Sequence, residues 1–187
     1  GVGTSMTDYL DQTQQPRQRH LLIDGLNLAR GGGVVVMARL ALAFSSVGYK
    51  VTVIASRDLS AIHFVGSGVE IIVESGALGA LRSMFYRRYR LNAQAQGLGA
   101  DSVLGFNYYS HVALPQVTYH INVIPFLPFL ERSRAVGYPR AIMQSFAARA
   151  ALRRSTANIF ESHHISSLAM GGGIEIRNPV VAYIGAD

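Results

Sequence analysis

The chain has 187 residues, of which 49% are hydrophobic, and it contains no cysteine. This size suits one globular domain, and the lack of cysteine excludes disulfides and thiolate metal sites. The formal net charge is +6, and nearly all of the base is arginine because Lys50 is the only lysine. Such a balance fits small anionic ligands, anionic lipid or nucleic acid, or simply a basic solvated surface.

The first segment, residues 1–19, is predicted to lie outside the fold. Residues 1–5, which precede Met6, resemble the remnant of an expression tag, and residues 7–19 have the polar composition of a flexible tail. No secretory signal is visible, and no apolar run reaches the roughly 18 residues that a transmembrane helix needs. We therefore expect a cytoplasmic protein.

The stretch from His20 to Ala55 predicts a strand, a glycine loop, a helix and a second strand. The loop ends in Gly31-Gly32-Gly33, the following residues 34–47 are apolar at almost every position, and residues 50–55 are rich in β-formers. Two strands joined through such a helix form a βαβ unit of a parallel sheet. The glycines precede the helix N-terminus, where unpaired N–H groups and the helix dipole favour a phosphate.

The remaining residues continue the alternation of strands and helices. Strands are expected at 69–73, 101–105, 116–120, 157–161 and 174–177, and helices at 78–95, 138–154 and 163–170. Residues 121–129 are expected to form an apolar loop, because Pro125 and Pro128 interrupt a helix. This pattern predicts an open, doubly wound, Rossmann-like α/β fold with a mainly parallel sheet of about seven strands.

Ligands of such sheets bind at the carboxyl ends of the strands, where the strand order reverses. Several polar residues follow predicted strands and should meet at this edge. They are the loop 25–33, Arg57, residues 107–109, His120, and Glu161 with Ser162.

Two common phosphate-binding motifs do not fit the glycine loop. A nicotinamide-binding turn needs Gly-x-Gly-x-x-Gly and an acid at the end of the second strand, but Gly25 and Gly31 are too far apart and the second strand ends in Ala55-Ser56-Arg57. A P-loop needs Gly-Lys-Ser/Thr, which is absent.

Four segments, in the right order, resemble family 4 glycosyltransferases. Gly31-Gly32-Gly33 and the apolar helix ending in residues 48–54 resemble the opening glycine loop, helix and Gly-His-Glu-Val-Thr-Val strand of that family. Residues 115–120 resemble its Pro-x-Val-x-Thr-x-His strand. Residues 155–162 and 173–180 resemble its Ala-Asp-x-Val-Ile-Ala-Val-Ser strand and its Val-x-Val-Ile-Pro-Asn-Gly-Val boundary.

The resemblance implies a GT-B enzyme, in which two Rossmann-like domains enclose the active site. Residues 20–180 would form the N-terminal, acceptor-side domain, and residues 181–187 would begin the interdomain linker. The C-terminal domain that binds the nucleotide sugar would be absent, as in an excised domain, although a complete short gene product stays open. The whole enzyme would transfer a sugar from a nucleoside-diphosphate sugar to a saccharide or lipid-linked hydroxyl, mostly with retention, without a metal or other cofactor.

The resemblance also suggests site residues. Gly32 and Gly33 would approach the donor diphosphate, and His120 would be catalytic, holding the donor sugar near the reacting carbon by position and charge. The family often carries a His-x-His near the fourth strand, where this sequence has Asn-Tyr-Tyr-Ser-His at residues 107–111, so a different acceptor chemistry is an open expectation. Candidate acceptor contacts are Asn27, Arg57, Asn107 and Tyr108. No metal site is expected, since His163 and His164 point to different sides of a helix.

The helix beginning at Leu78 is basic, with Arg82, Arg87, Arg88 and Arg90 among apolar and aromatic residues. It could lie on an anionic membrane surface, at the inner face of the plasma membrane, or be half-buried with a basic outer side. The apolar residues 123–130 could form an acceptor or lipid loop, or pack on the absent domain.

Two other classes of function stay open. The chain could be a nucleotide- or dinucleotide-binding module, or a response-regulator-like interaction domain. It could also be half of a different GT-B enzyme, such as a sugar epimerase. A nucleic-acid partner is not expected.

Overall fold

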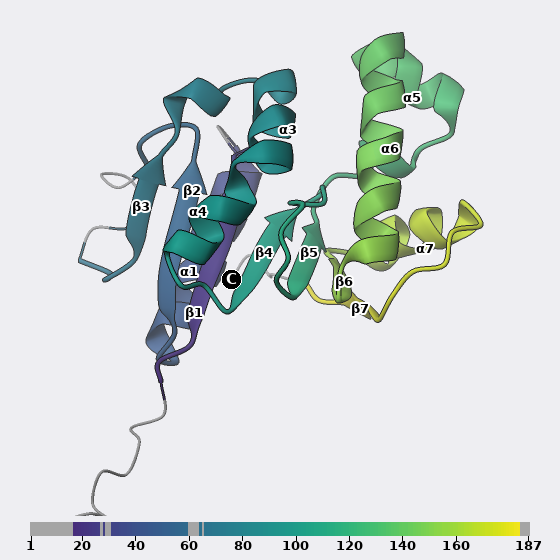
Figure 1. Ribbon diagram of the computed structural model, residues 1–187. Coiled ribbons are helices and arrows are strands. Elements are labelled where there is room, and N and C mark those ends of the chain that lie inside the picture. Colours follow the sequence, from purple (N-terminus) through teal and green to yellow (C-terminus); the bar gives the residue numbers. More distant parts are fainter. Residues whose placement is uncertain (1–16, 27, 29–30, 60–63, 65, 184–187) are drawn as a thin grey trace, which may run out of the picture.

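The computed structural model describes residues 17–26, 28, 31–59, 64 and 66–183, and its centre is a seven-stranded parallel sheet (Figure 1). The strand order is β3-β2-β1-β4-β5-β6-β7, and every neighbouring pair is parallel. The strands are β1 (His20–Gly25), β2 (Lys50–Ala55), β3 (Glu70–Val73), β4 (Ser102–Phe106), β5 (Gln116–His120), β6 (Ala157–Phe160) and β7 (Pro179–Val181). The predicted open, doubly wound α/β fold is confirmed.

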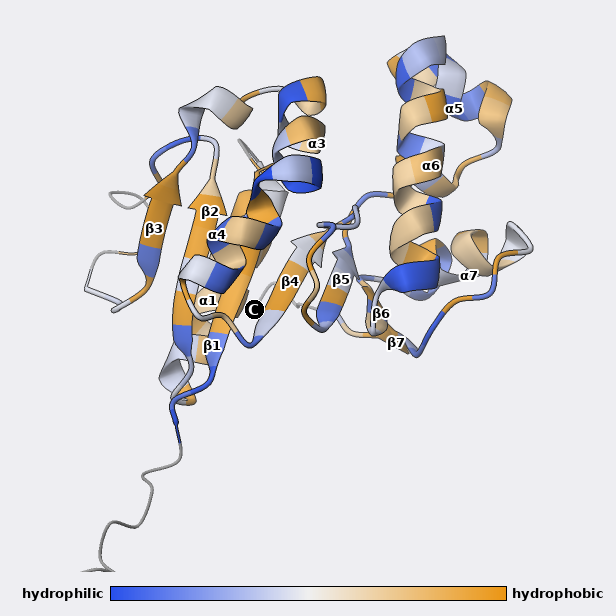
Figure 2. Ribbon diagram, in the orientation of Figure 1, coloured by the Kyte–Doolittle hydropathy of each residue, from blue (hydrophilic) through white to orange (hydrophobic). Residues whose placement is uncertain are grey.

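Alternate side chains of the strands pack on helices of opposite faces. Ile23 and Val53 form a core with Met37 of α1 (Gly32–Ser46), whereas Leu22 and Ile54 pack with α4 (Leu91–Gly97). The helices α3 (Ala80–Tyr89), α6 (Tyr138–Arg154) and α7 (His163–Gly171) complete the α4 side, and Figure 2 shows the apolar strands between the two layers. No helix of the described residues is long and apolar enough to cross a membrane.

Several boundaries match the sequence pattern closely. The helix α6 covers the predicted residues 138–154, with Pro139 in its first turn. Ser162 caps α7, since its Oγ accepts a hydrogen bond of 3.2 Å from the backbone N–H of Ile165.

The predicted helix 78–95 is wrong as a single element. A 3₁₀ turn, η2 (Ser75–Ala77), precedes α3, and the chain bends at Arg90 before α4 begins. The bend lets α4 place Leu91 and Ala95 on the sheet while α3 rises above its carboxyl edge. The loop 121–129 also contains one 3₁₀ turn, η3 (Ile124–Phe126), and leads into an unpredicted helix, α5 (Phe129–Val136).

The last strand was predicted at 174–177, and this is wrong. Ile174 and Ile176 pack as a loop on the core formed around Leu152 and Phe160. The strand β7 begins only at Pro179, after Asn178 turns the chain with a φ of 42°. Proline is tolerated there because it is the first residue of the strand.

The ends of the predicted domain differ slightly from the structure. Arg17, assigned to the tail, donates a hydrogen bond of 3.1 Å to the carbonyl of Gly99, and Gln18 donates one of 3.0 Å to the carbonyl of Gly48. Val181, assigned to the linker, belongs to β7. Residues 1–16 and 184–187 lie outside the described residues.

Candidate functional site

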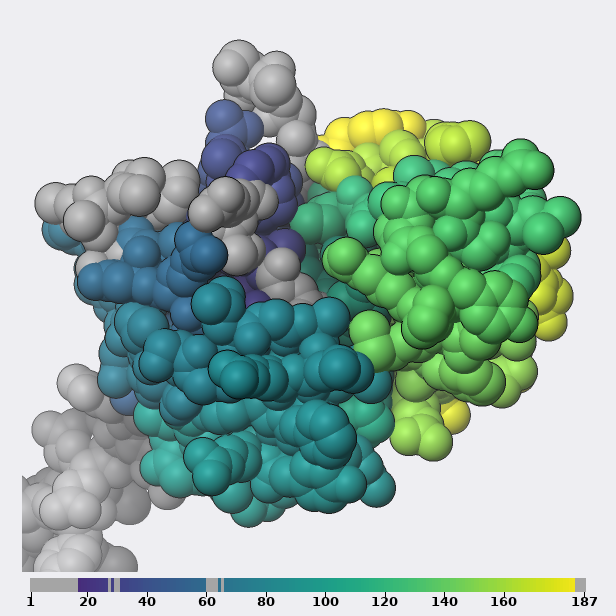
Figure 3. Space-filling model, turned by 90° about the horizontal axis from the view of Figure 1, so that it is seen from above, coloured from purple at the N-terminus to yellow at the C-terminus, as the bar shows by residue number. Residues whose placement is uncertain are grey.

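The strand order reverses between β1 and β4, and a cleft of about 490 Å³ opens there at the carboxyl edge. Figure 3 looks down on this edge and shows a hollow between the blue-teal half of the molecule and the green half. The described lining residues are Leu26, Leu28, Gly33, Ser56, Leu78, Gly79, Ala80, Met84, Asn107, Tyr108, Ile121, Asn122, Arg140, Met143, Gln144 and Ala147.

The N-terminus of α1 forms one wall of the cleft. Gly31 precedes the helix with a φ of 78°, and Gly33 lies in the cleft lining. The first N–H groups of a helix have no partner within it, so this wall presents donors and a positive dipole end. The described part of the first turn contains no acid to neutralise it. Gly33 therefore lies in the cleft at the carboxyl edge of the sheet, and its contact with a donor diphosphate stays a prediction.

Gly33 also allows a close approach of three chain segments. A methyl group at this position would lie 2.8 Å from Cδ1 of Ile121 and 2.9 Å from Cδ2 of Leu28, whereas one at Gly32 would have nothing within 4 Å. A side chain at Gly33 would thus displace the ends of the Leu28 and Ile121 side chains, whereas one at Gly32 would displace nothing.

We expect Gly33→Ala to have a free energy of unfolding lower than that of Gly32→Ala by up to about 1 kcal/mol, because the ends of the Leu28 and Ile121 side chains must shift only in the first variant. Gly32→Ala is the matched control and should be neutral or slightly stabilising, since its φ is not in the left-handed region and the space is open. Urea unfolding of both variants measures the difference. Greater damage from Gly32→Ala would contradict this view of the loop.

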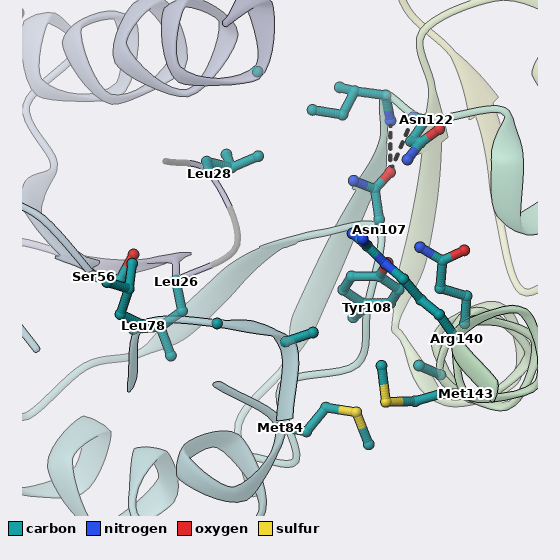
Figure 4. A pocket seen from close by; sticks show the side chains of 16 residues that line it. Leu26, Leu28, Ser56, Leu78, Met84, Asn107, Tyr108, Asn122, Arg140 and Met143 are labelled. Atoms are coloured by element: carbon teal, nitrogen blue, oxygen red, sulfur yellow. Dashed lines mark hydrogen bonds between the residues drawn. The ribbon is translucent and has the colours of Figure 1, made fainter. Parts of the chain in front are cut away.

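Asn107 holds the cleft wall together from the end of β4. Its backbone has a φ of 62°, and its Oδ1 accepts hydrogen bonds of 3.0 and 3.1 Å from the N–H groups of Ile121 and Asn122 (Figure 4). This clamp joins the carboxyl ends of β4 and β5. Tyr108 lies beside it in the lining, and burial raises the pKa of its phenol.

Gly32, Arg57 and His120 are not among the described residues that line the cleft. Arg57 follows β2 and is exposed, but only its neighbour Ser56 reaches the lining. His120 is 0% exposed, stacked on Phe160 with ring centroids 4.9 Å apart. In this buried position the imidazole does not reach the cleft, and its contact with a donor sugar stays a prediction. Asn27 lies outside the described residues.

Arg140 and Gln144 were missed by the sequence analysis. They lie in the first two turns of α6, and Figure 4 shows Arg140 extending from the helix toward Tyr108 and Asn107. The buried Oε1 of Gln144 has no hydrogen-bond partner among the described residues. No Asp, Glu or His is among the described lining residues. The lining offers the cation of Arg140, amide groups, and the phenol of Tyr108, whose pKa is raised by burial.

A buried ion pair beneath the cleft corrects the assignment of Arg87 to a membrane surface. The Arg87 and Asp24 side chains are only 3% and 1% exposed, and Nη2 of Arg87 donates to Oδ1 of Asp24 at 2.8 Å. Ser110 Oγ donates to the other carboxylate oxygen at 2.6 Å. Arg87 therefore anchors α3 to the end of β1, while Arg82, Arg88 and Arg90 are exposed.

An apolar groove of about 510 Å³ continues from the cleft between α3 and α6, and we call it the α3–α6 groove. Phe85, Tyr89 and Phe146 are 64%, 71% and 70% exposed there, which is unusual for large apolar side chains gathered together. Met84 and Met143 line both the cleft and the groove. Neither described helix contains an acidic residue, so the groove is apolar with a basic rim.

The described residues contain no cluster of three or more His, Asp or Glu that could hold a metal ion. His163 and His164 begin α7.

No family model and no curated protein matches this sequence. Among solved structures, a sucrose-phosphate synthase chain from Thermosynechococcus elongatus is similar over 90% of this chain and 91% of that chain, with a TM-score of 0.55 and 10% identity. A glycotransferase of kitacinnamycin is similar over 78% of this chain and 46% of that chain, with a TM-score of 0.48 and 17% identity. At 10% identity, the likeness to the sucrose-phosphate synthase chain shows the Rossmann-like fold alone.

Proposed function

We propose that this chain is the N-terminal, acceptor-side domain of a GT-B glycosyltransferase resembling family 4. The whole enzyme would transfer a sugar from a nucleoside-diphosphate sugar to a saccharide or lipid-linked hydroxyl, with retention and without a metal. The observation that carries the proposal is the cleft at the strand-order reversal, with a helix N-terminus on one wall and Arg140 on the other. The fold shared with a sucrose-phosphate synthase chain supports it.

The chemistry of the cleft favours binding over catalysis by this half alone. Its described lining can hold an anion at α1 and Arg140 and can orient hydroxyls at Asn122 and Gln144, but it has no carboxylate or imidazole, and burial raises the pKa of the Tyr108 phenol. A second domain would hold most of the donor, so nucleotide should bind weakly or not at all. For His120 we propose a positioning role, through Ile121 and Asn122, which follow it into the cleft wall.

The α3–α6 groove favours a lipid-linked acceptor over a free saccharide. An apolar chain leaving the cleft past Met84 and Met143 would cover the exposed rings of Phe85 and Phe146. The exposed Arg82, Arg88 and Arg90 would draw the same face to anionic lipid, at the cytoplasmic side of a membrane.

The test is calorimetric titration of the chain with octyl glucoside below its micelle concentration, glucose, a nucleoside diphosphate and a nicotinamide dinucleotide. We expect octyl glucoside to bind at least about tenfold more tightly than glucose, because the groove buries its chain. Phe146→Ser should abolish this preference. Leu130→Ser, which changes a side chain equally exposed at 70%, should keep it.

Three results would overturn the proposal. Equal affinity for octyl glucoside and glucose would contradict the proposal of a lipid-linked acceptor. Micromolar binding of the dinucleotide would favour a nucleotide-binding module. Sugar transfer by this chain alone, from a nucleotide sugar to an acceptor, would contradict its assignment as one half of an active site.

A further inference from the structure

A second cavity, of about 410 Å³, lies away from the cleft, between the segment from η3 to α5 and the helices α6 and α7. It shares no described lining residue with the cleft or the α3–α6 groove. Its walls are mostly apolar, with Phe126, Leu152 and Leu168 among them. Two arginines, Arg132 and Arg149, also line it, and the combination needs an explanation.

Arg132 is buried, with 7% of its surface exposed, and it is held in one orientation. Its Nη1 donates to the carbonyls of Pro125 at 2.6 Å and Leu127 at 3.3 Å, and its guanidinium lies 5.6 Å from the ring centroid of Phe129. Its Nε is buried and has no hydrogen-bond partner among the described residues. The two carbonyls therefore fix the Nη1 side of the guanidinium, while the N–H group at Nε donates to no described residue.

The charge of this cavity is unbalanced. Neither Arg132 nor Arg149 forms an ion pair with a described carboxylate, and no Asp or Glu is among the described lining residues. Burial, and then the nearby charge of Arg149, lower the pKa of Arg132. A buried cation without a counter-ion is costly, and a guanidinium matches carboxylates and phosphates well.

We propose that this cavity binds a small organic anion, a carboxylate or phosphate monoester with an apolar body. The anionic group would lie between Arg132 and Arg149, and the body would contact Phe126, Leu152 and Leu168. This site is separate from the acceptor cleft, and it does not depend on the proposed sugar transfer.

Calorimetric titration of the chain with phenyl phosphate, benzoate, inorganic phosphate and benzyl alcohol tests the proposal. We expect phenyl phosphate or benzoate to bind at least about tenfold more tightly than benzyl alcohol and inorganic phosphate, because both the charge and the ring contribute. The tighter of the two identifies the anion class. Arg149→Gln should weaken this binding at least about tenfold, since Arg149 is exposed and its loss should leave the fold intact.

Arg153→Gln, on the same helix but outside the cavity, is the matched control and should bind as the unchanged chain does. Arg132→Met adds a second measurement if the variant folds. The proposal is overturned if no anion binds, if benzyl alcohol or inorganic phosphate binds as tightly as the organic anions, or if Arg149→Gln has no effect. Loss of binding in Arg140→Gln instead would place the anion in the cleft and also overturn it.

Discussion

Asp24→Asn should lower the free energy of unfolding by about 3–5 kcal/mol, the usual cost of breaking a buried ion pair. The substitution removes the charge opposite a guanidinium that is 3% exposed, and it weakens the acceptor of the Ser110 and Leu26 hydrogen bonds. Urea unfolding followed by circular dichroism measures the loss. Because Arg87 anchors α3, we also expect the cleft wall at Met84 to become mobile in this variant.

Two variants separate a buried-charge effect from general damage. Arg17→Gln breaks the exposed ion pair with Asp101, whose side chains are 76% and 41% exposed, and should cost less than about 1 kcal/mol. Arg87→Met combined with Asp24→Asn removes both charges and should be less destabilised than Asp24→Asn alone. A double variant as unstable as the sum of both single changes would contradict the charge argument.

Most of the fold could be predicted from local sequence patterns. Apolar runs ended by turn residues identify the strands 50–55 and 116–120, and the tolerance of Pro139 in a first turn identifies the helix 138–154. The last strand could not be predicted in the same way. Ile174-Glu175-Ile176-Arg177 alternates as a strand does, but its isoleucines serve a loop that packs on α6 and α7.

The site was harder to predict because it depends on contacts between distant residues. Asp24 and Arg87 are 63 positions apart, and only the topology brings the inner side of α3 over the end of β1. Arg87 therefore looked equivalent to its exposed neighbours Arg82 and Arg88. Arg140 carries no motif, and it reaches the cleft only because α6 begins above the carboxyl edge of the sheet.

The burial of His120 also could not be predicted from its position in the sequence. Its position at the end of β5 was predicted, but the segment that follows returns over it, and Phe126 and Phe160 enclose the imidazole with ring centroids 5.3 and 4.9 Å away. The hydrogen-bond network places a proton on Nε2 of His120. Asn158 Nδ2 donates to the carbonyls of Leu152 and Arg177, so Asn158 Oδ1 accepts from Nε2 of His120 at 2.9 Å.

A proton added to His120 would therefore sit on Nδ1, which is buried without a hydrogen-bond partner among the described residues. Burial lowers the pKa of His120 from 6.5 to about 4, and the bond to Asn158 opposes this only in part. The unfolded chain then binds the proton more readily than the folded chain between these two values. Stability due to this group is complete above pH 6.5 and is lost as the pH falls toward 4, after which it changes no further.

Between pH 7 and pH 4 we expect the titration of His120 to lower the free energy of unfolding by about 3 kcal/mol, at 1.36 kcal/mol per pKa unit. His120→Gln, whose amide can still donate to Asn158, should be less stable at pH 7 but should lose that much less on acidification. Urea unfolding at intervals across this range measures both slopes. Val103→Ala, in the core beneath α4, is a control that should lower stability by a similar amount at every pH. If His120→Gln and the unchanged chain have parallel pH profiles, the buried imidazole does not titrate as the geometry requires.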